Sequence, residues 1–155
     1  MSLRFFMIRK IEKKDISHII EMYKNLMHQH EVIDTYYAPR NTIDYEKEIN
    51  YLMTNEKSFF FVAEEDKTLV GFITGTERDF DDRNEPFLYI SDIYVLEAFR
   101  KKSIGRQLLE VVYTEAKKKG LRRFELQVDL RNKDAVKFWN KNNFQSFMFR
   151  MKKDL

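Results

Sequence analysis

The sequence predicts a single domain of the α/β (α+β) class, in which helices cover both faces of a mostly antiparallel mixed sheet. The first observation behind this class is length, because a chain of 155 residues suits one domain, residues 1–155, and buries roughly 68–70% of its unfolded surface. The second is the order of the hydrophobic patterns, βααβββαβαβ, which differs from the strict strand–helix alternation of a Rossmann repeat.

The N-terminal third of the chain predicts a strand and two helices. Residues 5–10 read as the strand, and Asp15 offers an N-cap oxygen to a helix over residues 16–30, where apolar residues recur at helical spacing. Residues 31–40 are expected to form a loop. A shorter helix begins near Thr42.

The remainder of the chain predicts most of the sheet. The elements follow as strands at 58–64, 68–76 and 87–95, a helix at 103–119, a strand at 124–130, a helix at 132–142 and a final strand at 144–152. Every position from 59 to 63 is apolar, so we expect that strand to be buried on both faces. In the strand at 87–95 the alternation breaks at 93–95, which predicts a β-bulge.

The composition excludes several classes of protein. The chain has no cysteine, which rules out a disulfide framework, a thiolate zinc site and a cysteine nucleophile, and fits a cytoplasmic protein. Its apolar stretches are far shorter than the ~20 residues that span a bilayer, and no charged-then-apolar leader opens it, so we expect neither a membrane segment nor a secretion signal. His28 and His30 lie on different sides of a helix, so we expect no metal site.

The net charge of +3 hides an asymmetry along the chain. Residues 1–99 carry 12 basic and 19 acidic side chains, a balance of −7, whereas residues 100–155 carry 16 basic and 6 acidic ones, a balance of +10. This division fits two parts that bind partners of opposite sign, and it fits two solvated surfaces equally well. A nucleic-acid binder would use the basic part, but that part contains no known reading motif.

A short basic loop opens the most regular helix of the sequence. It consists of Arg100, Lys101, Lys102, Ser103, Ile104 and Gly105, with Arg106 directly after it. The first backbone N–H groups of a helix have no partner within the helix, and the helix dipole adds positive potential there. With the basic side chains they predict a site for a phosphate or pyrophosphate group, although many helices begin in a basic loop.

Two motifs carry a resemblance to a known family. Arg100, Ser103 and Gly105 follow a strand that ends in Val95, and they occupy the three defined positions of [Arg/Gln]-x-x-Gly-x-[Gly/Ala]. Further along, an Asn-x-x-Ala-x-x-aromatic pattern followed by Gly-Phe is matched by Asn132, Ala135, Phe138 and Phe144, with Asn143 where Gly is usual. In these motifs the chain resembles the GNAT-type N-acetyltransferase superfamily.

The resemblance implies a GNAT-like fold and transfer of an acetyl group from acetyl-coenzyme A (acetyl-CoA) to a primary amine, by direct attack in a ternary complex. Amides of the loop at 100–105 would hold the coenzyme pyrophosphate. The strands at 87–95 and 124–130 would splay apart for the pantetheine arm, and an N–H of the first would polarise the thioester carbonyl. The implied coenzyme-binding residues are Ile93, Val95, Arg100, Lys101, Lys102, Ser103, Ile104, Gly105, Arg106, Asn132 and Phe138.

Two positions depart from the family pattern. Ser103 stands where Gly is expected, and since a positive φ costs a non-Gly residue on the order of 1–2 kcal/mol, we expect the loop to avoid it and the hydroxyl to cap the helix or hold phosphate. Trp139 stands where many relatives carry the Tyr that protonates the departing thiolate, a role closed to an indole N–H. We expect Trp139 to pack in the core or against the coenzyme. The proton would come from water, the incoming ammonium or a tyrosine such as Tyr94.

On the acceptor side, Asp92 is the first candidate for the base that takes the proton of the attacking amine. The alternative is a structural role at a loop or beside an arginine, and for Tyr94, the second catalytic candidate, the alternative is sheet packing. Glu77 and Asp79 begin an acidic run that favours a cationic acceptor such as a polyamine, an aminosugar or a basic peptide. The alternative is a solvated hairpin tip.

Tyr36 and Tyr37 would stack on the acceptor from the other wall, although aromatic residues there more often pack. The alternative to an enzyme is a coenzyme-binding domain without turnover, which Ser103 and Trp139 would favour. The expected partners are a small amine or peptide acceptor, with neither nucleic acid nor membrane. The chain is expected to be a monomer or a homodimer.

Overall fold

The computed structural model describes residues 6–155, so Phe5, where the expected first strand begins, lies outside the described residues. In chain order the main elements are β1 (Phe6–Lys10), α1 (Ile16–Ile33), α2 (Tyr45–Thr54), β2 (Ser58–Glu65), β3 (Thr68–Arg78), β4 (Phe87–Val95), α3 (Ile104–Lys118), β5 (Phe124–Glu125) and α4 (Lys133–Lys141). Short 3₁₀ turns precede α1, follow α1 and follow β4.

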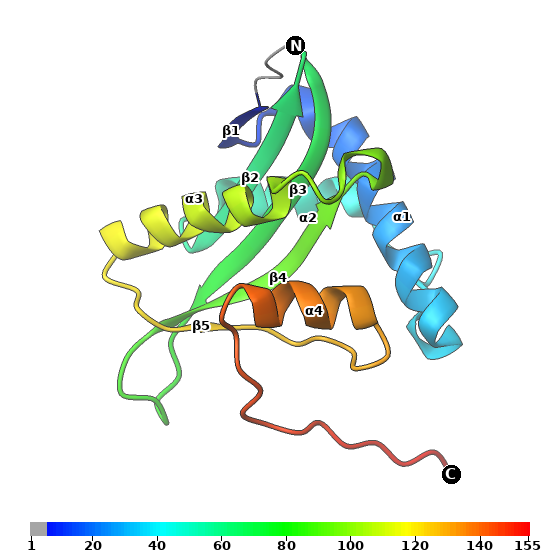
Figure 1. The fold of residues 1–155 in the computed structure, drawn as a ribbon, viewed down its shortest axis with the longest axis vertical. Coiled ribbons are helices and arrows are strands. Elements are labelled where there is room, and N and C mark those ends of the chain that lie inside the picture. Colours follow the sequence, from blue (N-terminus) through cyan, green and yellow to red (C-terminus); the bar gives the residue numbers. More distant parts are fainter. Residues whose placement is uncertain (1–5) are drawn as a thin grey trace.

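The strands form one five-stranded sheet in the order β1-β2-β3-β4-β5. Neighbouring strands are antiparallel except for β4 and β5, which are parallel. In Figure 1, α3 and α4 lie in front of the sheet, while α2 lies behind it and α1 runs along its right side. This mixed sheet, with helices on both faces, confirms the predicted fold class.

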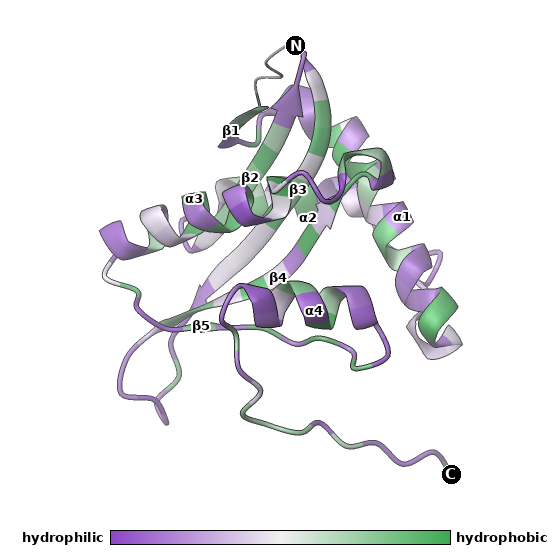
Figure 2. Ribbon diagram, in the orientation of Figure 1, coloured by the Kyte–Doolittle hydropathy of each residue, from purple (hydrophilic) through white to green (hydrophobic). Residues whose placement is uncertain are grey.

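Strand β2 is apolar on both faces because each face supports its own hydrophobic core. Phe59 and Phe61 belong to the core under α3 and α4, whereas Phe60 and Val62 belong to the core under α1 and α2. Figure 2 shows the hydrophobic residues gathered on the central strands, while α3 and α4 present many hydrophilic residues toward the viewer. The predicted burial of both faces is therefore confirmed.

A β-bulge interrupts the pairing of β4 with β3. Thr74 lies opposite Asp92 and Gly75 lies opposite Ile90, so Ser91 is an extra residue in β4. The bulge lies two residues before the position that the sequence analysis expected. It nevertheless accounts for the broken alternation from which a bulge was predicted.

The inserted residue exchanges the faces of β4 beyond it. Ile90 faces the α3 core before the bulge, and Ile93 faces the same core after it, although the two are an odd number of residues apart. As a result, Asp92 and Tyr94 point toward α1 and α2. The bulge therefore decides which side of the sheet receives the Asp92 carboxylate.

The C-terminal part differs from the sequence-based expectation. β5 has two residues instead of seven, and residues 142–155 form no strand, so the expected final strand at 144–152 is wrong. Residues 145–155, the C-terminal tail, are exposed and run away from the body of the protein (Figure 1). Phe149 and Met151 are each 90% exposed. The tail contacts the rest of the chain through side chains, as between Arg150 and Gln127 at 2.9 Å.

Asp15 holds the start of α1 differently from the predicted N-cap. Its carboxylate makes no capping bond to α1. It accepts hydrogen bonds from the Arg9 guanidinium at 2.7 and 2.9 Å and from the Glu12 N–H at 2.8 Å, and Arg9 also donates to Glu64 of β2 at 2.8 Å. Burial alone would raise the pKa of Asp15, but the bonds from Arg9 and Glu12 lower it overall. The cluster ties the start of α1 to β1 and β2.

Candidate functional site

The loop before α3 exposes a row of backbone N–H groups. None of the N–H groups from Ser103 to Arg106 donates a hydrogen bond within residues 6–155. Lys101 and Ser103 both adopt the left-handed conformation, with φ values of 60° and 63°. Successive N–H groups in such a turn form a concavity that binds anions, here at the positive end of a helix. The main chain of this loop is therefore suited to hold a phosphate group.

Ser103 contradicts the expectation that the loop avoids a positive φ. Its hydroxyl makes no capping bond to α3, so the capping role expected for it is wrong, and the role in holding phosphate stays a prediction. Asn143, the other residue that replaces a usual Gly, has a φ of 66°, which Asn tolerates better than most residues. Both replacements thus keep a left-handed backbone of the kind that Gly readily adopts.

Basic side chains surround this loop. Arg100 turns back onto β4, because its Nε donates to the carbonyl of Val95 at 2.9 Å and its guanidinium lies 5.6 Å from the centre of the Tyr94 ring. Lys101, Lys102 and Arg106 are exposed to solvent. They add positive charge around the N–H groups without blocking them, as an anion site requires.

The edge of β4 that faces β5 is open beyond Tyr89. β5 pairs with Leu88 and Tyr89 alone, so the two strands separate as the sequence analysis expected. Ile93 and Val95 lie on the open stretch, and their side chains are partly buried against the α3 core. Main-chain groups of this stretch have no strand partner on the β5 side within the described chain, so a ligand could pair with them there.

Gly105 has a packing role at the start of α3. A Cβ at this position would lie 3.0 Å from Cε2 of Phe138 and 3.7 Å from Cδ1 of Ile93. The Phe138 ring of α4 thus rests directly on the first turn of α3. The space that a side chain at position 105 would need is therefore filled by Phe138.

Asn132 and Trp139 both have structural roles in α4. The Asn132 side chain caps the helix by accepting the N–H of Ala135 at 3.2 Å. Trp139 is buried, and its ring makes edge contacts with Phe138 and Phe144 at centroid distances of 5.0 Å. The core-packing interpretation of Trp139 is therefore confirmed.

Asp92 is the chemically distinctive residue on the α1–α2 face of β4. Its Oδ2 accepts from the Thr74 hydroxyl at 3.3 Å and lies 3.5 Å from the Tyr23 hydroxyl of α1. Burial raises the pKa of Asp92, and these hydrogen bonds oppose the rise only in part. Burial and the Asp92 charge also raise the pKa of Tyr23, which keeps that phenol a neutral donor. A carboxylate with a raised pKa and two neutral donors is suited to exchange a proton with a ligand.

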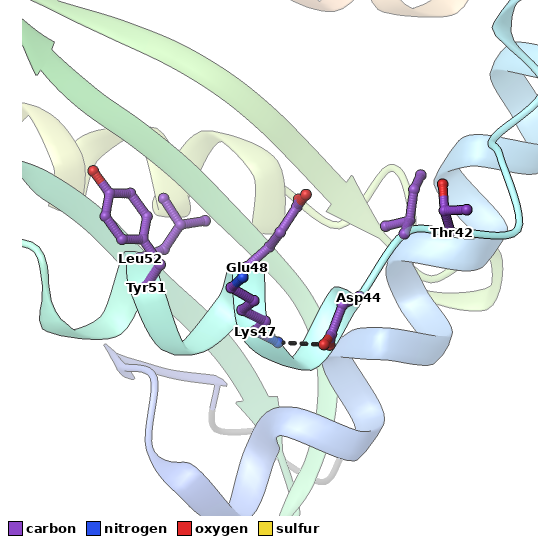
Figure 3. A pocket seen from close by; sticks show the side chains of 7 residues that line it. Thr42, Asp44, Lys47, Glu48, Tyr51 and Leu52 are labelled. Atoms are coloured by element: carbon purple, nitrogen blue, oxygen red, sulfur yellow. Dashed lines mark hydrogen bonds between the residues drawn. The ribbon is translucent and has the colours of Figure 1, made fainter.

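Asp92 lines a cavity of about 280 Å³ between β4, α1 and α2. Its lining residues are Tyr23, Met27, Ile43, Tyr45, Glu48, Ile49, Leu52, Thr74, Ser91 and Asp92. A larger hollow of about 690 Å³ lies along α2 and shares Ile43, Glu48 and Leu52 with the cavity; Figure 3 shows Glu48 extending from α2 between Tyr51 and Thr42. The larger hollow does not reach Asp92, so the smaller cavity is the candidate acceptor site.

The three tyrosines that the sequence analysis singled out do not line this cavity. Tyr36 and Tyr37 are exposed on the turn after α1, and their rings contact each other edge-on at 5.6 Å. Tyr94 is buried, with its ring 6.2 Å from that of Phe72. Its position favours the packing alternative that the sequence left open.

The acidic run also lies apart from the cavity. Glu77 pairs with Leu88 at the beginning of β4, whereas Asp92 lies beyond the bulge, and Asp79 follows the end of β3. Neither carboxylate lines the cavity or its neighbouring hollow. The alternative of a solvated hairpin fits their positions.

An ion-pair bridge joins α1 to the loop before α4. Arg131 donates to Asp34 at 3.0 Å and to Asp129 at 2.7 Å. The hydrogen bonds from Arg131 lower the pKa of Asp129 to about 2. His30 of α1 interacts electrostatically with both Asp129 and Asp92, so it lies within reach of the bridge and of the cavity.

Sequence reasoning missed three residues around Asp92: Tyr23, Glu48 and Thr74. Tyr23 follows the apolar stripe of α1 and reads as core, Glu48 reads as a solvated helix residue, and Thr74 reads as an ordinary strand residue. They come from α1, α2 and β3, which the fold brings together at β4, so no local sequence pattern marks them. Only the tertiary fold reveals them.

Two further properties concern the described part of the chain. Among residues 6–155, no group of three or more His, Cys, Asp or Glu side chains is arranged to hold a metal ion. Within the same residues, no helix combines the length and the apolar character that crossing a membrane would need.

Comparison with known sequences points to one family. Residues 21–144 match the acetyltransferase (GNAT) family. The uncharacterized N-acetyltransferase MJ1207 of Methanocaldococcus jannaschii is 27% identical over 150 residues, which cover 92% of this chain and 62% of that protein. The chain therefore spans less than two thirds of the length of the curated relative that it matches.

Solved structures share the fold at low sequence identity. A tetramutant of the BH1408 protein from Bacillus halodurans is 20% identical with a TM-score of 0.87, and the match covers 96% of this chain and 99% of the other. The aminoglycoside N-acetyltransferase AAC(6')-Iy, in complex with CoA, is 19% identical with a TM-score of 0.80, over 98% of this chain and 95% of the other. At these identities the likeness concerns the fold.

Proposed function

Because the chain belongs to the acetyltransferase (GNAT) family, we propose that it transfers an acetyl group from acetyl-CoA to a primary amine of a small cationic molecule. The observation that carries the proposal is the arrangement around β4. The anion-binding loop follows its C-terminal end, its edge is open beyond Tyr89, and the Asp92 cavity adjoins its bulge. One strand thus connects a place for the coenzyme with a place for the amine.

The coenzyme side fits the loop before α3. The N–H groups from Ser103 to Arg106 would hold the pyrophosphate, with Lys101 and Lys102 beside them, and the open edge at Ile93 and Val95 would pair with the pantetheine amides. When bound, acetyl-CoA supplies the thioester whose carbonyl carbon the amine attacks. A structural neighbour, the aminoglycoside N-acetyltransferase AAC(6')-Iy, is described in complex with CoA, which supports this assignment.

On the acceptor side, Asp92 would serve as the base. The amine arrives as an ammonium and gives one proton to the carboxylate, its nitrogen bonds to the carbonyl carbon, and the carbon–sulfur bond breaks to release the thiol. A raised pKa makes Asp92 a better proton acceptor than an ordinary aspartate. Tyr23 and Thr74 orient the carboxylate from the side. Trp139 is buried in the core, so the departing sulfur takes the second proton that the nitrogen loses on forming the amide, passed on through water.

A thiol-release assay with acetyl-CoA and a panel of primary amines tests the proposed function. We expect release with at least one cationic amine, and we expect Asp92→Asn to lower kcat while the Kd for CoA stays unchanged. Coenzyme binding without release for any amine in the panel would overturn the transfer proposal. It would favour the alternative of a CoA-binding domain without turnover, to which the buried Trp139 points.

The loop assignment has its own test. Arg106→Pro removes one N–H from the first turn of α3, where proline is best tolerated in a helix. Arg106→Ala removes the same charge but keeps the N–H. Because a hydrogen bond to a charged group is worth roughly 1.5–3 kcal/mol, we expect calorimetry to show the proline variant binding CoA about tenfold more weakly than the alanine variant. Equal affinities, with α3 intact by circular dichroism, would show that this N–H does not contact the coenzyme.

A further inference from the structure

The cavity beside Asp92 is lined by two carboxylates and by mainly apolar and aromatic side chains. Asp92 lies on its strand side, and Glu48 lies where the cavity meets the outer hollow, because it lines both. Figure 3 shows the Glu48 side chain extending away from α2. The rest of the lining is mainly apolar and aromatic, and it consists of Tyr23, Met27, Ile43, Tyr45, Ile49 and Leu52 together with the smaller Thr74 and Ser91.

Neither carboxylate is neutralised by a neighbour. Within residues 6–155, neither Asp92 nor Glu48 forms an ion pair, and no Lys or Arg lines the cavity. Lys47 lines the outer hollow but not the cavity. His30 is the remaining basic side chain that acts on Asp92, from α1. The Glu48 charge raises the pKa of Asp92 and of Tyr23, so negative charge accumulates around the cavity.

The size and the walls of the cavity restrict the kind of cation. A volume of about 280 Å³ falls below the roughly 300–1,000 Å³ of pockets for drug-sized ligands. The stacked rings of Tyr23 and Tyr45, 6.4 Å apart, form one wall, and aromatic faces attract cations. The hydroxyls of Tyr23 and Thr74 already donate to Asp92, so an aminosugar would bring more hydroxyls than the lining can pair, which is costly, whereas methylene groups match its apolar side chains.

We propose that the acceptor is a short linear diamine, whose reacting nitrogen lies at Asp92 and whose second, charged nitrogen is held by Glu48. The inference rests on the proposed function for the reacting end and adds a selecting residue for the other end. A monoamine would leave Glu48 unpaired. Acetylation removes one of the two positive charges, so the product matches the cavity less well than the substrate and leaves more readily.

Equilibrium binding tests the inference without turnover. Calorimetry compares 1,4-diaminobutane with butylamine on the protein saturated with CoA. Because an ion pair that keeps contact with water is worth at most about 1 kcal/mol, we expect the diamine to bind on the order of fivefold more tightly, and Glu48→Gln to remove this preference. Glu46→Gln is the matched control, since Glu46 is an exposed residue of the same helix outside both cavities. Equal binding of the two amines, or a preference that survives Glu48→Gln, would overturn the inference.

Turnover then separates this inference from the proposed function. With both amines as substrates, we expect kcat/KM to favour the diamine on the order of fivefold, and the ratio to approach one in Glu48→Gln but not in Glu46→Gln. Release that is equally efficient with butylamine would overturn the diamine inference and leave the transferase function standing. Absence of release, together with diamine binding that depends on Glu48, would overturn the transferase function and support a diamine site.

Discussion

Asp92 occupies a position that reduces the stability of the fold. Burial raises the pKa of Asp92. When a carboxyl group has a higher pKa in the folded than in the unfolded state, the folded protein loses stability as pH rises above the unfolded pKa. We therefore expect Asp92→Asn to raise the melting temperature at pH 7, and to lose this advantage below the ordinary aspartate value of 3.8. Differential scanning calorimetry at pH 7 and pH 3, together with the turnover assay, would show stability gained where activity is lost.

Asp129 provides the opposite case and serves as the control. Hydrogen bonds from Arg131 lower the pKa of Asp129 to about 2. Its contribution to the stability of the fold is therefore fully present above the ordinary pKa of 3.8, and it is lost as pH falls through about 2. Asp129→Asn should lower the melting temperature at pH 7, by a small amount because water screens the pair. Shifts of the same sign in both variants would contradict the assigned pKa directions.

Ser103 allows a test of backbone strain that is separate from side-chain chemistry. Ser103→Gly relieves a φ of 63°, and we expect the free energy of unfolding to rise by on the order of 1 kcal/mol, with CoA affinity unchanged because the main chain makes the contacts. Ser103→Ala keeps the strain and removes only the hydroxyl, so it should change neither quantity. A weaker CoA affinity in Ser103→Ala would instead place the hydroxyl on the phosphate. Urea unfolding and calorimetry measure the two effects.

The contact of α3 with α4 decides the effect of a substitution at Gly105. Alanine is favoured over glycine in a helix by roughly 1 kcal/mol, but a Cβ 3.0 Å from the Phe138 ring overpacks a core at a cost of typically 1–3 kcal/mol. The ring is held against Trp139 and cannot yield easily. We expect Gly105→Ala to lower the free energy of unfolding by about 1 kcal/mol, and Phe138→Leu to recover part of it. If the double variant changed the free energy of unfolding by the sum of the two single effects, measured in urea, that result would contradict the contact between the two residues.

The elements that the sequence predicted best are those whose own residues specify them. β4 has the expected bounds, and α3 differs by one residue at each end. The strand expected at 144–152 failed because alternation specifies a face, whereas a strand also needs a neighbour to pair with. β5 ends after two residues, so the neighbouring edge that this segment would need is absent within the described chain.

The same difference separates the two halves of the candidate site. The loop proposed for the coenzyme is contiguous, so the sequence alone is enough to single out Arg100 to Arg106 as a candidate anion site. The acceptor cavity draws on β3, β4, α1 and α2, and its residues carry no shared local pattern. Asp92 was found because of its place in the family's strand, whereas Glu48 required the tertiary fold.

For the molecule as a whole, the C-terminal tail is a dispensable part of the fold. Its links to the body join Arg150 to Gln127, Lys152 to Asp34 and Arg123 to the Phe147 ring, and each is worth at most about 1 kcal/mol. A chain that ends at Phe144 keeps the contact with Trp139. We expect this truncation to lower the free energy of unfolding by no more than about 3 kcal/mol, measured by urea unfolding.

The truncation should also change solubility. The tail exposes Phe147, Met148, Phe149 and Met151, and exposed apolar groups of this kind promote association. Light scattering at increasing concentration should show less association for the shortened chain. Loss of the folded signal in circular dichroism on removal of residues 145–155 would show that the tail contributes to the core after all.

The extra residue in β4 has a consequence for how such a protein can diversify. Because the bulge at Ser91 exchanges the faces of the strand, the loop proposed for the coenzyme belongs to the layer of α3, and the candidate acceptor cavity belongs to the layer of α1 and α2. Substitutions on α1 and α2 can therefore alter the choice of acceptor while the donor layer is left intact. Deletion of Ser91 alone would leave Ile90 opposite Gly75 and Asp92 opposite Thr74 in regular alternation, so each side chain would keep its face and the strand would lose only the bend that the bulge introduces.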